Sequence, residues 1–162
     1  MAIDLPKPLR IDNAYAFIDH PTRLAVYKYW GVVTPKETGA VYAWIGATLQ
    51  SLPPSYARGA VFDFREVEEF EIGNTPVAKR ASKEANQNAD QSELSLMPVV
   101  MLVGSLRQEV KVSTSMMGAP ELRKRIVRSQ EGGLEFLNKW NAEHNRTFDI
   151  DESMLNHWPT LD

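Results

Sequence analysis

The sequence contains no cysteine among its 162 residues, which excludes disulfides, thiolate catalysis and metal sites built on cysteine. It also lacks a large excess of one charge. The formal net charge is −3, so the overall electrostatics do not favour binding to nucleic acid or to an anionic membrane. No apolar run approaches the roughly 20 residues of a transmembrane helix, and the first residues lack the basic and apolar segments of a signal peptide. We therefore expect a soluble, cytoplasmic protein.

Motifs of known chemistry are missing as well. The sequence has no Gly-x-Gly-x-x-Gly, no Gly-x-x-x-x-Gly-Lys-Ser/Thr and no Gly-x-Ser-x-Gly, so neither nucleotide binding nor hydrolase chemistry has support. His20, His144 and His157 are not spaced as metal ligands, and we expect no metal and no cofactor. Asp63 lies inside an apolar run, where burial would raise its pKa and make it a candidate general base. We favour a structural carboxylate that bonds backbone amides of the next loop, and a protein that is not an enzyme.

Residues 59–75 are the most informative stretch of a chain that is long enough for about one domain. Ala60 to Phe64 predict a strand buried on both faces. An acidic turn with Glu66, Glu68, Glu69 and Glu71 follows, and a helix begins near Asn74 or Thr75. Functional sites of α/β proteins lie where a strand leads into a helix. We predict a partner-binding loop formed by Phe70, Glu71, Ile72, Gly73, Asn74 and Thr75.

The rest of the chain alternates between strand and helix patterns, which predicts an α/β fold with a mixed, mainly parallel sheet. The expected elements are strands over 15–19 and 24–33 joined as a hairpin, a helix from 34 to about 49, a strand over 59–64, a helix from 75 or 76 to about 88, a loop over 89–95, a strand over 96–103, an edge strand over 125–129 and a last helix through 140. Residues 105–117 fit a strand or a helix equally well.

Three parts are expected along the chain: an extended or loose lead-in over 1–13, a folded domain over 14–144 and a tail over 145–162. The tail is acidic, yet it carries apolar side chains such as Phe148, Leu155 and Trp158. It therefore packs back on its own domain, covers a groove or engages a second copy, and a homodimer is one of the expected states.

The succession of motifs resembles the STAS-domain superfamily, and within it the SpoIIAA-like branch of small bacterial proteins. The matching stretches are 24–35, which end in Tyr-Trp-Gly-Val-Val-Thr-Pro, then 60–67 with Ala-Val-Phe-Asp-Phe-Arg-Glu-Val, 99–104, and 125–140. The resemblance covers roughly residues 14–142. It implies a mixed sheet with an N-terminal hairpin and about four flanking helices, a helix over 105–117 and no catalytic machinery.

In anti-sigma-factor antagonists of this superfamily, the strand that matches Ala60 to Phe64 leads to a phosphorylatable serine at a helix start. Here that loop has no serine, and its single hydroxyl belongs to Thr75, which is followed by Pro76. Glu68, Glu69 and Glu71 would also repel an added phosphate. The resemblance therefore implies a regulatory or binding domain that engages an unknown protein partner without a serine phospho-switch.

Two alternatives stay open. The first is a binder of a small apolar ligand, or a protein in peripheral contact with a membrane, which would use the helices around 35–50 and 105–118. Its apolar pocket would be lined by Trp44, Met101, Met116 and Met117. The second is an enzyme, which only Asp63 and the acidic loop support.

Overall fold

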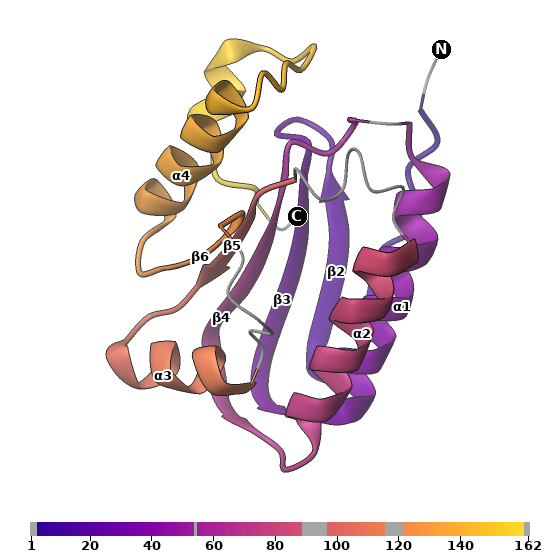
Figure 1. Ribbon diagram of the computed structural model, residues 1–162, viewed down its shortest axis with the longest axis vertical. Helices are drawn as coiled ribbons and strands as arrows, with labels where there is room; N and C mark the ends of the chain where they lie inside the picture. Colours follow the sequence, from indigo (N-terminus) through magenta and orange to yellow (C-terminus); the bar gives the residue numbers. More distant parts are fainter. Residues whose placement is uncertain (1–2, 54, 89–96, 116–121, 161–162) are drawn as a thin grey trace.

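The computed structural model describes residues 3–53, 55–88, 97–115 and 122–160 (Figure 1). Within them the strands are β1 (Leu9–Ile11), β2 (Ala14–Asp19), β3 (Leu24–Val33), β4 (Gly59–Phe70), β5 (Val99–Leu102) and β6 (Lys124–Val127). The helices are α1 (Pro35–Ser51), α2 (Asn74–Asn88), α3 (Leu106–Ser115) and α4 (Gln130–Glu143), followed by the 3-10 helix η2 (Glu152–Asn156).

The strands form one sheet in the order β1-β2-β3-β4-β5-β6. The first two pairings are antiparallel and the following three, from β3 to β6, are parallel. This arrangement confirms the predicted α/β class, the N-terminal hairpin and the mainly parallel sheet. It also confirms the helix over 106–115, which had been assigned on the resemblance against its β-branched residues. The predicted loop over 89–95 lies outside the described residues.

The lead-in predicted over 1–13 as extended or loose contains β1, which is the extended alternative. Leu9 pairs with Ala16 and Ile11 with Ala14 across a tight turn at Asp12, whose φ is 27°. Asp is one of the few residues that adopt a left-handed backbone readily, which permits the short turn. Pro6 and Pro8 had suggested a loose segment, but both lie before the strand and leave its backbone donors in place.

The strand predicted to end at Phe64 is also longer than expected, because β4 continues through the supposed acidic turn to Phe70. Its second half pairs with β3 as far as Val33, with two register shifts on the way. Val67 is buried while the glutamates around it are exposed, which is the alternation of a half-buried strand. Negative charge had suggested a turn, but glutamates are tolerated on a strand whose other face is packed.

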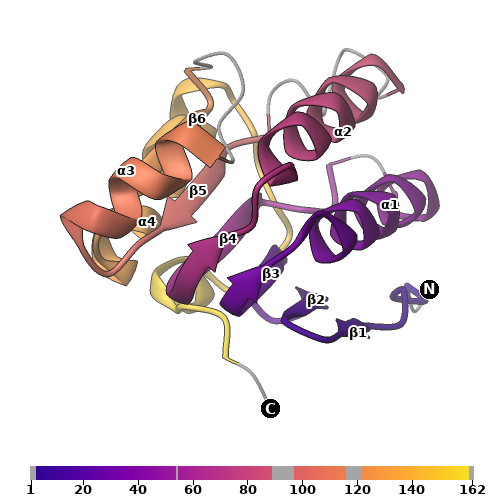
Figure 2. The ribbon, with the colours of Figure 1, turned by 90° about the horizontal axis from the view of Figure 1, so that it is seen from below.

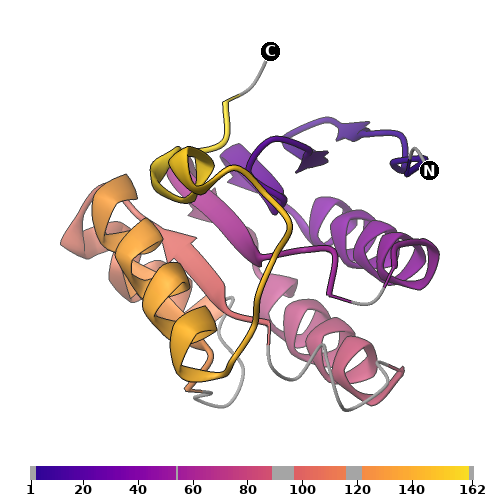
Figure 3. The same cartoon turned by 90° about the horizontal axis from the view of Figure 1, so that it is seen from above.

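Helices cover both faces of the sheet (Figures 2 and 3), and a hydrophobic layer lies on each face. Helices α1, α2 and α3 contribute to the larger layer, in which Tyr27, Phe62 and Met101 come from neighbouring strands in register. Helix α4 packs on the opposite face, with Leu134, Phe136 and Leu137 against Leu24, Val26, Val61 and Val100. Both faces of the central strands are therefore covered, which accounts for their unbroken apolar runs.

The tail packs back on its own domain, the first of the three predicted arrangements. Trp158 joins the layer under α4, and a Cβ on Gly133 would lie 3.2 Å from its ring. The carbonyl oxygen of Leu155 accepts a hydrogen bond from Asn138 Nδ2 at 3.1 Å. The carbonyl oxygen of Asp149 accepts one from Arg23 Nη2 at 2.7 Å. The tail thus runs over the amino ends of the parallel strands.

Candidate functional site

The predicted partner-binding loop is shorter than six residues, because β4 ends at Phe70 and α2 begins at Asn74. The Phe70 ring packs edge-on against Phe64, with 5.7 Å between the ring centroids. Asn74 is fully buried, and its Oδ1 accepts a hydrogen bond from the Thr38 hydroxyl. Phe70 and Asn74 therefore connect the loop to the core, Thr75 is half-buried at the start of α2, and 71–73 remain exposed.

Ile72 is the outermost point of this turn and is 99% exposed. The turn is well fixed, since the Glu71 N–H donates to the Val33 carbonyl oxygen at 2.8 Å and the Asn74 N–H to the Glu71 carbonyl oxygen at 3.1 Å. Gly73 has a φ of +96°, which favours glycine. Val32, near the end of β3, is 44% exposed at the same end of the sheet. An isoleucine held outside the core on a rigid turn contributes nothing to the packing of the fold.

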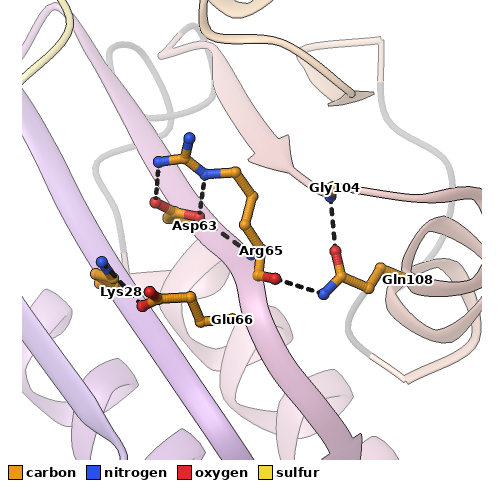
Figure 4. Close-up of polar contacts among 6 residues, drawn as sticks. All are labelled: Lys28, Asp63, Arg65, Glu66, Gly104 and Gln108. Carbon is orange, nitrogen blue, oxygen red and sulfur yellow. Dashed lines mark hydrogen bonds and ion pairs between the residues drawn. The ribbon is translucent and has the colours of Figure 1, made fainter.

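Exposed carboxylates precede Ile72 along the chain. Glu66, Glu68, Glu69 and Glu71 all point to solvent from the second half of β4 and the turn after it. Glu66 forms an ion pair with Lys28, Nζ to Oε2, at 3.0 Å (Figure 4). Among the described residues, no ion pair involves the other three. We call this surface, made of Val32, Glu66, Glu68, Glu69, Glu71 and Ile72, the acidic rim.

Asp63 is buried beside the rim and is fully engaged by Arg65 (Figure 4). Its Oδ1 accepts from the Arg65 backbone N–H at 3.1 Å and from Nε at 3.0 Å, and its Oδ2 accepts from Nη2 at 2.8 Å. These bonds, led by the side-chain hydrogen bond, raise the pKa of Arg65. The predicted bond from Asp63 to a backbone amide is confirmed, although the amide belongs to the same strand. Both oxygens of the Asp63 carboxylate bond to the Arg65 guanidinium, so the ion pair links two residues of β4.

Side chains of α3 cover the edge of β4 where β5 has already ended. Gln108 Nε2 donates to the carbonyl oxygens of Arg65 at 2.6 Å and Val67 at 3.1 Å, while its Oε1 accepts from the Gly104 N–H at 2.6 Å (Figure 4). Lys111 Nζ donates to the Glu68 carbonyl oxygen at 2.5 Å. The side chains of Gln108 and Lys111 thus bond to the backbone of β4 as a neighbouring strand would, and they hold in place the half of β4 that carries the acidic rim.

The residues predicted to line an apolar pocket lie in two places. Met101 is 2% exposed and belongs to the core row with Phe62. Trp44 is half-buried on α1, where its ring meets the edge of Tyr27 and its Nε1 donates to the Lys7 carbonyl oxygen at 2.9 Å. Met116 and Met117 lie outside the described residues. The two described residues thus have packing partners of their own.

The histidines are engaged separately from one another. His20 Nδ1 lies 2.6 Å from the Tyr56 hydroxyl, and the ring of His144 stacks on Trp140. In the part of the chain that the structure describes, no three His, Asp or Glu side chains are grouped so that they could hold a metal ion. No helix in that part is both long and apolar enough to cross a membrane.

Arg58 was not predicted as a candidate functional residue from the sequence. It is the largest of the fully buried side chains. It lies directly before β4, at the amino end of the strand, and its Nη2 atom has no hydrogen-bond partner among the described residues. The only signal in the sequence was an arginine adjoining a buried strand, and such a position more often faces solvent.

No protein-family model matches the sequence, and no curated protein matches it either. Two solved structures are similar to the fold. One is the anti-sigma factor antagonist SpoIIAA in its unphosphorylated form, at 11% identity and a TM-score of 0.37, covering 70% of this chain and 88% of that one. The other is an uncharacterised protein of the DUF3478 family from Shewanella loihica, which has a SpoIIAA-like fold. It shows 11% identity and a TM-score of 0.43, covering 81% of this chain and 90% of that one.

Proposed function

We propose that this chain is a non-enzymatic binding domain that engages a protein partner through the acidic rim. The observation that carries the proposal is Ile72, which is 99% exposed at the end of a stretch rich in exposed carboxylates. The chemistry of the rim selects a partner with a basic segment that also presents an apolar cavity for Ile72. A cytoplasmic regulatory role in a bacterium belongs to the same proposal.

The energetics favour such a contact. Burying an isoleucine side chain is worth about 2 kcal/mol, which makes Ile72 a suitable central anchor. Glu68, Glu69 and Glu71 add long-range attraction for a basic partner and raise the association rate. The turn is already fixed by its backbone hydrogen bonds and by buried Asn74, so binding orders little new structure.

The proposed binding does not depend on serine phosphorylation. Thr75 is the only hydroxyl of the loop; it is half-buried in the first turn of α2 and precedes Pro76. The carboxylates of the rim disfavour a further negative charge at this place. The apolar-ligand alternative has no comparable support, because described Met101 and Trp44 already pack against aromatic neighbours.

Site-specific photo-crosslinking in cells tests the proposal. A photoreactive amino acid at position 72 is expected to capture a protein, whereas the same group at exposed Glu152, at the other end of the molecule, is expected not to capture it. The captured partner is then purified and its affinity is measured. Ile72→Ser is expected to weaken binding by about tenfold or more, and added salt is expected to weaken it further.

Leu122→Ser is the matched control, because Leu122 is also an exposed apolar residue, at 89%, but lies outside the rim. The proposal fails if both substitutions weaken binding equally, or if the partner binds equally well with Glu68 and Glu69 reversed to lysine.

A further inference from the structure

Arg58 is a buried cation, and no carboxylate among the described residues forms an ion pair with it. Its side chain is 0% exposed. Its Nε donates to the Thr22 carbonyl oxygen at 3.2 Å and its Nη1 to Asn138 Oδ1 at 2.7 Å, and both acceptors are neutral. Its Nη2 is buried and bonds to nothing among the described residues. Buried charges in proteins are normally paired with an opposite charge, so this guanidinium lacks a partner that its burial requires.

Two further arginines contact the Arg58 backbone, since the Arg58 N–H also donates to the Arg23 carbonyl oxygen at 2.7 Å. Arg146 of the tail donates to the carbonyl oxygens of Arg58 at 3.4 Å and Ala57 at 3.1 Å. Arg23 of the β2–β3 turn is tied to the tail at Asp149. The nearby Asp19 carboxylate accepts from the Thr22 N–H at 3.0 Å and from its hydroxyl, and does not bond to Arg58. Burial lowers the pKa of Arg58 to about 10, and no carboxylate offsets that effect.

We propose that Arg58 is the centre of a binding site for a small oxyanion, either phosphate or carboxylate, which bonds to Nη2 and supplies the missing negative charge. A guanidinium presents a planar fork of donors that matches both oxyanions. The Nη2 donor provides the contact. This site lies at the opposite end of β4 from the acidic rim, so it is independent of the proposed partner surface.

The tail is the cover of this site. Asn138, which accepts from Arg58, donates in turn to the Leu155 carbonyl oxygen, and Arg146 bonds to the backbone on the other side. None of the tail residues from Thr147 to Ser153 is buried: Phe148 and Ile150 are half-buried and the others are exposed. Because few buried contacts secure the tail here, an anion reaches Nη2 by a local displacement of the tail that leaves the sheet intact.

Thermal unfolding of the full chain in inorganic phosphate and in acetate tests this site. Each titration is compared with sodium chloride at equal ionic strength. We expect a saturable rise in Tm of about 3 °C or more with at least one of the two anions. A response to phosphate alone assigns the site to phosphate groups, and a response to acetate alone assigns it to carboxylates. If neither anion exceeds the effect of chloride, Nη2 is satisfied by water and the proposal is overturned.

Two variants locate the effect. Arg58→Gln is expected to abolish the anion response, while Arg80→Gln, at an exposed arginine on α2, is expected to retain it. If Arg58→Gln does not fold, Asn138→Asp decides the matter, because it places a carboxylate beside Arg58 Nη1. We expect this variant to have a higher Tm than wild type in anion-free buffer and at least a tenfold weaker response to the anion. An undiminished response in Asn138→Asp would place the anion elsewhere and contradict the proposal.

Discussion

Arg58 lies directly before β4 and Arg65 lies within it, yet their guanidinium groups have opposite environments. Arg65 has a 39% exposed side chain and an ion pair with Asp63, and its pKa is raised. Arg58 is fully buried among neutral acceptors, and its pKa is lowered by burial to about 10. The better-solvated arginine thus has the counter-ion, and the one that needs it more has none among the described residues. The need of a buried charge for a counter-ion explains the environment of Arg65 but not that of Arg58.

The position of each residue along the strand explains the difference. Asp63 and Arg65 are separated by one residue in an extended strand, so their side chains leave the same face and meet without any other element. Arg58 precedes the strand and is enclosed by the β2–β3 turn, α4 and the tail, none of which brings a carboxylate to it. The first arrangement is local and self-contained, whereas the second depends on segments far apart in sequence.

Removing Asp63, the counter-ion of Arg65, is expected to have the largest effect on the free energy of unfolding. Asp63→Ala deletes both guanidinium contacts and the acceptor for the Arg65 N–H, and we expect a loss of about 2–3 kcal/mol in the free energy of unfolding, measured with urea. The value lies at the low end for a buried pair because Arg65 is partly solvated and regains water. Asp63→Asn, which keeps one acceptor oxygen, is expected to lose about half as much. A loss below about 1 kcal/mol in the alanine variant would show that the Asp63–Arg65 ion pair contributes little to the stability of the fold.

Uncovering the edge of β4 is expected to have the next largest effect. Gln108→Ala removes the donor to the Arg65 and Val67 carbonyl oxygens, and we expect a loss of about 1 kcal/mol. Hydrogen exchange of the backbone amides over 65–68 is expected to accelerate several-fold, because the second half of the strand then opens more readily. Ser113→Ala, at an exposed residue of the same helix, is the control and is expected to change neither quantity. Equal exchange in both variants would mean that α3 does not protect this edge.

The architecture was predictable where local pattern and packing agree. The capping residues Thr34 and Glu37 marked the start of α1 correctly, and the Thr34 N–H donates to the Glu37 carboxylate at 2.9 Å. The apolar runs of β4 and β5 marked strands covered on both faces. The second half of β4 was missed because exposed glutamates weaken the strand pattern, and its pairing with β3 could only be seen in three dimensions.

The candidate sites were predictable to different degrees. Ile72 and Glu71 are adjacent in sequence, so a loop at this place could be proposed from the sequence, whereas the burial of Asn74 and the packing of Phe70 on Phe64 became visible only in the structure. The environment of Arg58 was invisible, because Thr22, Asn138 and Arg146 reach it from three distant segments. Contacts of long sequence separation leave no periodic signal in a single sequence.

Arg58→Met is expected to change stability by only about 0.5 kcal/mol in buffer free of phosphate and carboxylates. The variant loses hydrogen bonds to Thr22 and Asn138, which cost about 1 kcal/mol each, but it also removes an uncompensated charge from the interior. The two effects nearly cancel, in contrast to Asp63→Ala. Urea denaturation of both variants under the same conditions measures the contrast. If Arg58→Met proves more costly than Asp63→Ala, a compensating negative charge is already present and the comparison between the two arginines breaks down.

Removing an ion pair that is exposed to solvent is expected to have the smallest effect on stability. Lys36 Nζ lies 2.9 Å from Asp12 Oδ2, and the side-chain hydrogen bond from Lys36 is the main cause that lowers the pKa of Asp12 below its usual 3.8. A carboxyl whose pKa is lower in the folded than in the unfolded state stabilises the protein above the unfolded pKa, and this contribution is lost as the pH falls through the folded pKa.

In Lys36→Met, NMR titration of the Asp12 carboxyl is therefore expected to give a pKa closer to 3.8, with little change in stability at pH 7. Lys79→Met, at an exposed lysine on α2, is expected to leave the titration of Asp12 unchanged. An Asp12 pKa that stays low without Lys36 would instead assign the shift to the backbone of the β1–β2 turn, where the carboxylate also accepts a hydrogen bond.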